Sequence, residues 1–376
     1  MADPVIIVGG GAIGLATGFE LLRAGIPTTI LDRNRACRGT SWLAAGMLAP
    51  DTEIGFEELE LYDLNRESLR RWPEFAAAVE EASGRDVDYR DDGTLIVADD
   101  PDSTKRIRRL YEFQKEQGLD VDWLTGDEAR DREPFVGPRV SAAIWVESDH
   151  QVDNRLLLDA LREAFLAEGG SLREDTPVER IHPDDEAPAV VTEDGEEIRG
   201  RDVVIAAGVW SRQLDGLAPA EPPRVRPVKG QMIQMKLPFD LQHVTRGPDA
   251  YLAPKSNGRL VIGATSEEMG FDTQVTAGGL YDLLEGAWEI VPGVYDLAVD
   301  DTWAGLRPAS RDHAPIVGRS GAPGVIVATG HYRHGILLAP VTAQEVTKLV
   351  ETGETSRWIE PFSPARFSGP IPESSA

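Results

Sequence analysis

A glycine-rich turn near the N-terminus constrains the fold of this chain more than any other stretch. The apolar segment VIIVG at residues 5–9 predicts a short buried strand, and residues 13–24 have the apolar periodicity of a helix. Gly9, Gly11 and Gly14 lie between the two segments in the spacing G-x-G-x-x-G. A second strand is expected at residues 28–32, so the chain begins with a β-α-β unit.

Each glycine of this motif has a separate physical reason. Gly9 permits a tight turn, Gly11 lets the backbone approach a pyrophosphate, and Gly14 allows the helix to pack closely on the strand. The N-terminus of the helix then faces the phosphates with its free N–H groups. Asp32 ends the second strand, where a carboxylate accepts hydrogen bonds from an adenosine ribose. The sequence therefore predicts a dinucleotide site.

The remaining pattern predicts two interleaved domains. Buried strands recur in the middle of the chain (DVVIAAG) and near its end (GVIVATG), while the segments between them are rich in short alternating strands. This order indicates a discontinuous, Rossmann-like α/β domain that carries an interleaved, mainly antiparallel β domain. We expect residues 1–86, 149–221 and 306–376 in the nucleotide domain and residues 87–148 and 222–305 in the other domain.

Three local features carry further expectations. The pair Asp92-Gly93 between apolar runs predicts a β-hairpin. Asn154 is expected to cap the N-terminus of a helix that Gly169 and Gly170 end. Near the C-terminus, the strand GVIVATG is followed by the histidine- and arginine-rich segment GHYRHGILLAP, with a helix expected to begin near Gly335.

Charge and cysteine content exclude several classes of function. The formal net charge of −26 argues against a nucleic-acid partner, since phosphates would be repelled. Cys37 is the single cysteine, so an intrachain disulfide, a redox dithiol or a thiolate metal site cannot form, and we expect no metal. No apolar run is long enough to span a membrane, and the first residues lack the pattern of a signal peptide. We therefore expect a cytoplasmic protein with no membrane partner.

The kind of dinucleotide is indicated by what surrounds the first motif. The small residues of GTSWLAAGMLAP, residues 39–50, would let backbone amides reach a bulky planar ring, although a tightly packed core loop has the same composition. A second G-x-G-x-x-G motif for NADPH is absent from the sequence. If the cofactor is a flavin, its electrons therefore come from a substrate.

The chain resembles the FAD-dependent D-amino-acid oxidase superfamily, and most closely its glycine oxidases of thiamine biosynthesis. The resemblance rests on the segments IIVGGGAIG, TSWLAAGMLAP, VVIAAGVWS, PVKGQM, YLAPKSNGRLVIGAT, WAGLRPAS and GHYRHGILLAP, which follow the family order over nearly the whole chain. It implies the D-amino-acid oxidase fold and an FAD cofactor. The sarcosine-oxidase branch holds its flavin through a cysteine in the C-terminal third, where this chain has none, so we expect non-covalent FAD.

The resemblance also implies which residues lie at the cofactor. They are Gly9, Gly11, Ala12, Ile13 and Gly14 at the pyrophosphate, Asp32, Arg33 and Val178 at the adenosine, Thr40, Ser41, Ala45, Gly46 and Met47 along the flavin, His331, Tyr332, Arg333, His334, Gly335, Ile336 and Leu337 at the pyrimidine end of the flavin, and Gly208 and Gly330 as further cofactor-binding residues.

Tyr251, Arg307 and Arg333 match the positions at which the family holds its substrate. A planar guanidinium binds a carboxylate through two parallel hydrogen bonds, so Arg307 is expected to hold the acid end of an amino acid. No side chain is expected to act as a general base, because hydride leaves the substrate directly for the flavin. His331 and His334 are more often packed, hydrogen-bonded residues than acids or bases.

The function that follows is oxidation of glycine, or another small amine or D-amino acid, to the imine or 2-oxo acid, with O2 reduced to hydrogen peroxide. A glycine oxidase would supply glycine imine for thiazole synthesis. The alternatives are a sarcosine or D-amino-acid oxidase, a quinone-linked dehydrogenase of the same fold, or a flavin-binding subunit of a heteromeric complex. The family also tends to form oligomers, so self-association is possible.

Overall fold

The computed structural model describes residues 3–56, 58–218 and 220–367, and the chain divides into two compact units. The first unit consists of Met1–Arg38, Leu161–Arg226 and Pro308–Ala376, and the second of Gly39–Ala160 and Pro227–Arg307. Both units are thus assembled from separated stretches of chain. The domain boundaries expected from the sequence place residues 39–86 with the nucleotide domain, and they stay a prediction.

The first unit is built on a six-stranded sheet with the order β18-β19-β12-β1-β2-β8. Its strands are β1 (Val5–Val8), β2 (Thr28–Leu31), β8 (Ser171–Arg173), β12 (Val203–Ile205), β18 (Ile316–Arg319) and β19 (Val325–Thr329). All neighbouring pairs are parallel except β18 with β19. The central strands are fully buried on both faces, which explains their continuous apolar sequences.

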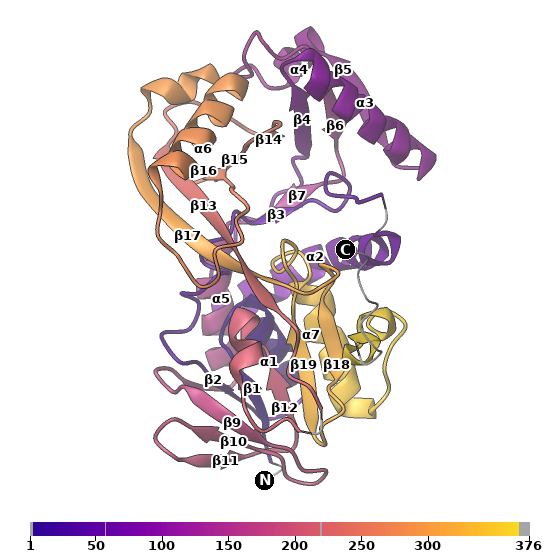
Figure 1. Ribbon diagram of the computed structural model, residues 1–376, viewed down its shortest axis with the longest axis vertical. Coiled ribbons are helices and arrows are strands. Elements are labelled where there is room, and N and C mark those ends of the chain that lie inside the picture. Colours follow the sequence, from indigo (N-terminus) through magenta and orange to yellow (C-terminus); the bar gives the residue numbers. More distant parts are fainter. Residues whose placement is uncertain (1–2, 57, 219, 368–376) are drawn as a thin grey trace, which may run out of the picture. The chain divides into compact units, whose positions relative to one another are not determined.

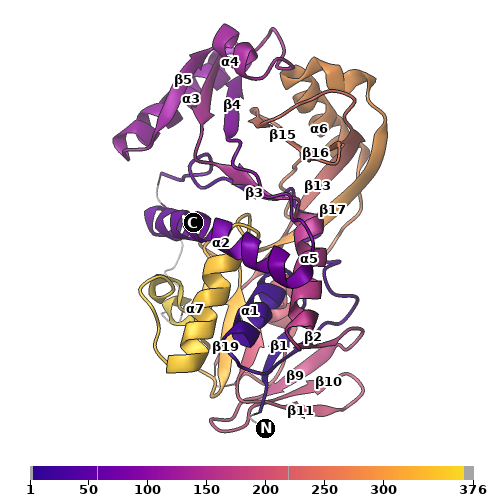
Figure 2. The ribbon, with the colours of Figure 1, turned by 180° about the vertical axis from the view of Figure 1, so that it is seen from behind.

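Helices and a small second sheet cover the two faces of this sheet. Helices α1 (Ala12–Arg23) and α7 (Ala339–Thr352) pack against each other over one face (Figure 2). The antiparallel strands β9 (Val178–His182), β10 (Ala189–Thr192) and β11 (Glu197–Arg199) bury Ile181 and Val190 against Ile6 and Val203 of the large sheet. This unit also contains the short 3-10 helices η1 (Gly208–Gln213), η3 (Glu360–Phe362) and η4 (Pro364–Phe367).

The second unit is built on an eight-stranded sheet with the order β17-β13-β16-β15-β14-β4-β6-β5 (Figure 1). Its strands are β4 (Thr94–Ala98), β5 (Val121–Thr125), β6 (Ala142–Val146), β13 (Arg226–Lys236), β14 (Val244–Arg246), β15 (Tyr251–Pro254), β16 (Arg259–Gly263) and β17 (Val299–Ala309). β14 pairs in parallel with β4, and the β15, β16 and β6 ladders are antiparallel.

Helices line this second sheet and its margins. They are α3 (Pro101–Glu116), α4 (Gly126–Arg132) and α6 (Ala277–Ile290). The same unit also contains the long helix α2 (Leu59–Ser83), the turn η2 (Pro292–Asp296) and the two-stranded ladder of β3 (Met47–Leu48) and β7 (His150–Gln151). Helix α5 (Asn154–Ala167) contains a boundary between the two units, because Ala160 belongs to the second unit and Leu161 to the first. Leu283 and Ile290 of α6 pack on Ile233 and Ile262 of the sheet. The expected fold class, a parallel Rossmann-like sheet with a mainly antiparallel second sheet, is confirmed.

The hairpin expected around Asp92 and Gly93 is wrong. β4 pairs with β6 and β14. The segment before Gly93 does not pair with β4; instead Arg90 forms a β-bridge with the distant residue Gln151. Gly93 has a φ of +76° and donates its N–H to the Asp149 carbonyl at 3.1 Å. The turn residues therefore redirect the chain, but the partner strands come from elsewhere in the sequence.

Candidate functional site

The glycine motif has the geometry that its spacing predicts. Gly9 adopts a φ of +112°, and a Cβ there would lie 2.5 Å from the Ala206 carbonyl oxygen of the adjacent strand end. A Cβ on Gly14 would lie 1.9 Å from the Gly9 carbonyl oxygen. Gly11 precedes the first residue of α1. No larger side chain fits at Gly9 or Gly14 without moving the backbone of this turn.

Asp32 is held at the end of β2 by two backbone amides. Its Oδ2 accepts the N–H of Gly10 at 2.7 Å, and its Oδ1 accepts the N–H of Asn34 at 2.9 Å. The carboxylate is thereby fixed beside the glycine turn while each oxygen keeps a further lone pair. Next to it, the Arg33 guanidinium stacks on the Trp210 ring with 3.8 Å to the centroid. Burial lowers the pKa of Arg33, and the charge of Asp32 opposes that effect.

Further glycines from the expected cofactor set gather at the same edge of the sheet. Gly208 (φ +56°) follows β12, which lies beside β1 in the sheet, and Gly330 (φ +76°) follows β19, which lies beside β12. The Thr329 hydroxyl donates to the Gly208 carbonyl at 3.1 Å, which ties the two turns together. Val178 begins β9. The carboxyl ends of three parallel strands therefore present small residues, as a dinucleotide crevice requires.

The segment HYRH combines one deeply buried histidine with one exposed arginine. His331 is 2% exposed, and its Nε2 lies 3.0 Å from the Thr342 hydroxyl of α7. Burial lowers the pKa of His331 to about 3, helped by the neighbouring His334. A histidine with this pKa stays neutral at physiological pH, which favours the packed role over acid-base chemistry.

Arg333 was expected to help hold the substrate, and that role stays a prediction. Its side chain is exposed, with the guanidinium 5.2 Å from the Tyr332 ring centroid. Tyr332 has a φ of +48° and stacks on His313 at 4.6 Å. Helix α7 begins at Ala339, so the expected start near Gly335 is wrong. Turns precede the helix, with hydrogen bonds from the His334 and Leu338 N–H groups to the preceding carbonyls.

The loop of small residues after Arg38 is held in the second unit by polar side chains. The Asn154 amide donates to the carbonyls of Ser41 and Trp42, both at 2.9 Å. The Trp303 indole donates to the Leu43 carbonyl at 2.9 Å, and the Thr40 hydroxyl donates to the Leu306 carbonyl at 2.7 Å. Four contacts thus fix the course of the loop that carries Thr40, Ser41, Ala45, Gly46 and Met47.

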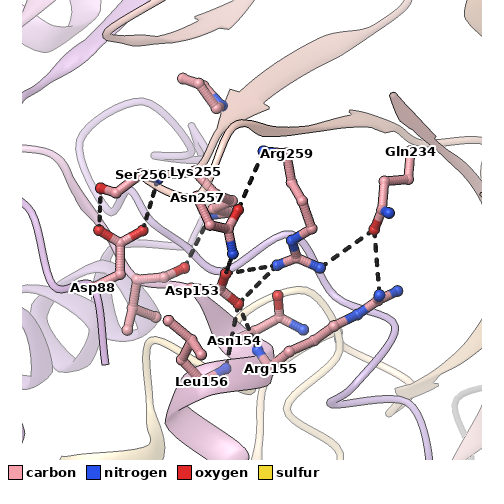
Figure 3. A network of polar contacts seen from close by, with 12 residues as sticks. Asp88, Asp153, Asn154, Arg155, Leu156, Gln234, Lys255, Ser256, Asn257 and Arg259 are labelled. Carbon is pink, nitrogen blue, oxygen red and sulfur yellow. Dashed lines mark hydrogen bonds and ion pairs between the residues drawn. The ribbon is translucent and has the colours of Figure 1, made fainter. Parts of the chain in front are cut away.

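The helix cap next to this loop is not the expected residue. Asp153 accepts the N–H groups of Arg155 and Leu156 and an ion pair from Arg259 at 2.7 Å (Figure 3). Asp153 therefore caps α5, and the Asn154 cap is wrong by one position. Because Asp153 satisfies the helix end, the Asn154 amide is available for the loop.

Lys255 is buried behind the same network (Figure 3). Its Nζ donates to the Val152 carbonyl at 2.9 Å and to Gln151 Oε1 at 3.2 Å. Burial lowers the pKa of Lys255 to about 7, against the opposing charge of Asp153. The hydrogen bonds of the Lys255 Nζ thus go to the end of β7, the strand that pairs with β3, and to the residue after it.

Tyr251 and Arg307 meet at one short segment of the second unit. Tyr251 pairs with Gly263 across the β15–β16 ladder, and a Cβ on Gly263 would lie 2.4 Å from the Tyr251 hydroxyl. Two residues further on, the Thr265 carbonyl accepts a hydrogen bond from Arg307 Nη1 at 3.0 Å. The two side chains expected to hold substrate therefore lie along Gly263–Thr265.

The Arg307 guanidinium is partly buried against the backbone of β13. A Cβ on Gly230 would lie 2.4 Å from Nη1 and 2.5 Å from Nη2. Within residues 3–56, 58–218 and 220–367, no carboxylate forms an ion pair with Arg307. A partly buried guanidinium with only a carbonyl partner retains donors and positive charge for an anionic ligand.

Comparison with known proteins identifies the family. A family model described as FAD dependent oxidoreductase, DAO, matches residues 4–349. The chain belongs to this family. The fold supports the assignment, because the solved glycine oxidase of Geobacillus kaustophilus matches with a TM-score of 0.91 and 35% identity over 98% of this chain and all of that one.

Two kinds of curated relative accompany this match. The glycine oxidase of Geobacillus kaustophilus is 35% identical over 371 residues, which cover 98% of each chain. The bifunctional protein ThiO/ThiG of Synechocystis sp. is 35% identical over 373 residues, 96% of this chain but 54% of the relative. This oxidoreductase therefore spans about half the length of the bifunctional relatives that it matches.

The residues of the first unit fit FAD. The tight turn at Gly9 and Gly14, where a Cβ would meet backbone carbonyl oxygens, precedes the N-terminus of α1, and Asp32 is held rigidly with lone pairs available for a ribose. In the described parts of the chain, no cluster of three or more His, Cys, Asp or Glu side chains is suited to a metal ion. Every helix there is too short or too polar to cross a lipid bilayer.

The sequence resemblance indicated Arg307 and Tyr251 but did not identify the small residues that they contact. Gly230 lies in PVKGQM, and Gly263 with Thr265 lies in VIGAT, segments that were noted only as matching the family. A glycine within a strand often marks the close approach of another group. That signal was present at Gly230, but it does not name the approaching residue.

Replacing Gly230 by alanine is expected to weaken binding of a carboxylate ligand about 10- to 100-fold in this FAD-dependent oxidoreductase, because the new Cβ displaces the Arg307 guanidinium. Titration of the flavin spectrum with acetate measures the effect. Gly278→Ala in α6 is the matched control, since a Cβ there meets nothing within 4 Å. Unchanged acetate binding by Gly230→Ala would contradict the contact.

Proposed function

We propose that this oxidoreductase oxidises glycine or a similarly small amino acid to its imine and passes the electrons to O2, which becomes hydrogen peroxide. One observation carries the proposal: Arg307 is partly buried, bonds to the Thr265 carbonyl and pairs with no described carboxylate. In a chain with a net charge of −26, a guanidinium that no acidic residue neutralises is suited to bind the carboxylate of a ligand.

The residues of the second unit select and orient the substrate. Arg307 presents a planar pair of donors to the carboxylate, while its hydrogen bond to the Thr265 carbonyl restricts rotation of the guanidinium. Tyr251 adds a phenolic hydroxyl along the same segment. Fixing the carboxylate orients the Cα–H bond, so that positioning supplies a large part of the rate enhancement.

The residues of the first unit would hold FAD. Gly9 and Gly14 maintain the tight turn in front of α1, Gly11 would let the backbone approach the pyrophosphate, and Asp32 would accept the ribose hydroxyls. When bound non-covalently, FAD supplies the two-electron acceptor for the substrate and the donor for O2. Once its amine has lost a proton and is neutral, the substrate loses a hydride from Cα and a further proton from nitrogen. The resulting imine either leaves or is hydrolysed by water to the 2-oxo acid and ammonia.

The relatives support glycine as the first substrate to test. A glycine oxidase is 35% identical over almost the whole chain. The bifunctional ThiO/ThiG relative is also 35% identical, over 54% of its own length. On that basis we propose that the imine serves the thiazole synthesis of thiamine. Cytoplasmic location and self-association complete this proposal.

The experiment is an anaerobic titration of the purified holoenzyme. Glycine is expected to bleach the visible absorbance of the oxidised flavin, whereas glycinamide, which lacks the carboxylate, is expected to leave it intact at the same concentration. Admission of air should restore the absorbance and yield one peroxide per flavin reduced. An absence of bleaching with glycine, sarcosine and small D-amino acids would exclude the proposal.

The same experiment separates the alternatives of this fold. Faster bleaching by sarcosine or D-alanine than by glycine would assign an oxidase with a different preference. Bleaching that air does not reverse, but that a quinone does, would assign a dehydrogenase. Bleaching that requires a second polypeptide would assign a subunit of a heteromeric complex.

A further inference from the structure

A buried lysine lies beneath the segment that holds Arg307. Lys229, the neighbour of Gly230 on β13, is fully buried. Its Nζ forms an ion pair with Asp272 Oδ2 at 2.8 Å and lies 3.8 Å from Glu267 Oε2. A buried ammonium is costly unless it is paired, so this cluster fixes the two carboxylates in place.

The two carboxylates belong to the irregular segment 264–276, which follows β16. The backbones of Lys229 and Glu267 exchange hydrogen bonds at 2.9 and 3.0 Å, forming a bridge. The Glu267 carboxylate accepts the Thr265 hydroxyl at 2.5 Å and the Gln231 amide at 2.8 Å. Burial would raise the pKa of Glu267, but these hydrogen bonds and Lys229 outweigh it and lower the pKa. Glu267 is therefore charged at neutral pH.

Thr265 connects this cluster to Arg307. Its hydroxyl accepts the Gln231 N–H at 2.8 Å and donates to Glu267, while its carbonyl accepts Arg307 Nη1 at 3.0 Å. The positions of the Thr265 hydroxyl and of its carbonyl are thus both fixed by hydrogen bonds to neighbouring residues. A shift of the 264–276 segment would move the carbonyl that orients the guanidinium.

We propose that Lys229 is a positioning residue for substrate binding: by pairing with Asp272 and Glu267 it fixes segment 264–276, and thereby the Thr265 carbonyl that orients Arg307. This inference rests on the proposed role of Arg307 in holding the substrate carboxylate. Lys229 itself touches neither substrate nor cofactor in this scheme. Its effect is transmitted through two ion pairs and one backbone carbonyl.

The test is a double-mutant cycle on the holoenzyme, read by acetate binding. Acetate carries the carboxylate but cannot be oxidised, so its dissociation constant is measured from the change in the flavin spectrum without turnover. Lys229→Met is expected to raise this constant at least fivefold. In the Arg307→Ala background the same substitution is expected to change it less than twofold, because the orienting contact is already lost.

A merely structural role gives a different pattern. If Lys229→Met weakens acetate binding by the same factor in both backgrounds, or by less than twofold in the wild-type background, the inference is overturned. If Arg307→Ala itself leaves acetate binding unchanged, the proposed function fails first. Lys236→Met is the matched control, since Lys236 is an exposed lysine on the same strand. This variant should bind acetate as the wild type does.

A second substitution covers the case that Lys229→Met fails to fold. Asp272→Asn keeps the shape of the partner and removes its charge at a side chain that is one third exposed. It is expected to raise the acetate dissociation constant at least threefold in the wild-type background and less than 1.5-fold with Arg307→Ala. An equal effect in both backgrounds would contradict the proposed transmission through segment 264–276.

Discussion

Replacement of Arg307 by alanine is expected to lower kcat/KM for glycine by about 30- to 1000-fold, which corresponds to about 2–4 kcal/mol of lost transition-state stabilisation. The reason is the loss of a charge-assisted, two-point contact with the carboxylate at a partly buried site. Arg307→Lys keeps the charge but loses the planar fork, so we expect an intermediate loss.

FAD should stay bound in both variants, because the hydrogen bond from Arg307 goes to Thr265 and its close packing is against Gly230. Steady-state kinetics and the ratio of flavin to protein absorbance measure the two properties separately. Arg139→Ala serves as the control, because Arg139 forms an exposed ion pair with Glu289. Amino-acid oxidation that survives Arg307→Ala within about threefold would remove Arg307 from the site.

The second large effect concerns stability, and it arises from a buried acid outside the proposed site. Asp149 is fully buried, and its Oδ1 accepts the Asp51 N–H at 3.2 Å. Its Oδ2 has no hydrogen-bond partner among the residues that the structure covers. Burial raises the pKa of Asp149 to about 8, and the nearby Asp51 charge acts in the same direction. Asp149 is therefore protonated in the folded protein at neutral pH.

This raised pKa makes stability fall as pH rises. An unfolded aspartate loses its proton near pH 3.8, whereas the folded protein keeps the proton until about pH 8. Between these values the folded state binds more protons, so each increase in pH favours unfolding. The contribution of Asp149 is fully present below pH 3.8 and is lost as pH rises through 8. Between pH 5 and pH 8 the free energy of unfolding is expected to fall by roughly 2–4 kcal/mol through this group.

Asp149→Asn is therefore expected to stabilise the protein increasingly as pH rises, because an amide needs no proton to stay neutral. At pH 8 the thermal midpoint should exceed that of the wild type by about 3 °C, and near pH 4 the difference should vanish. Scanning calorimetry at several pH values measures it. Asp120→Asn, at an exposed position, should give a pH-independent difference. A flat difference for Asp149→Asn would contradict the protonated state.

Some features of the proposed site could be read from the sequence because their causes are local. Gly9 and Gly14 are required by the turn itself, and Asp32 ends a strand directly beside that turn in any β-α-β unit. The order of strand and helix patterns likewise predicted a parallel sheet, because a short connection containing a helix joins neighbouring parallel strands. The family resemblance added Arg307 and Tyr251.

Other predictions failed where a distant partner decides the outcome. Asp92-Gly93 is a good hairpin signal, yet β4 pairs with β6 and β14, which lie far away in sequence. Asn154 has a favourable residue type for a helix cap, but Asp153 occupies that role and also pairs with the distant Arg259. Residue type alone does not distinguish between two adjacent capping candidates.

The sequence by itself determined the nucleotide-binding turn and the class of fold, since these depend on backbone sterics and on periodicity, whereas the arginine proposed for the carboxylate came from the family resemblance. Only the tertiary structure decided that Gly230 and Thr265 orient Arg307 and that Lys229 lies beneath them. The physical reason is that these contacts join β13, β17 and the segment that follows β16, and long-range packing of this kind leaves no periodic signal along the chain.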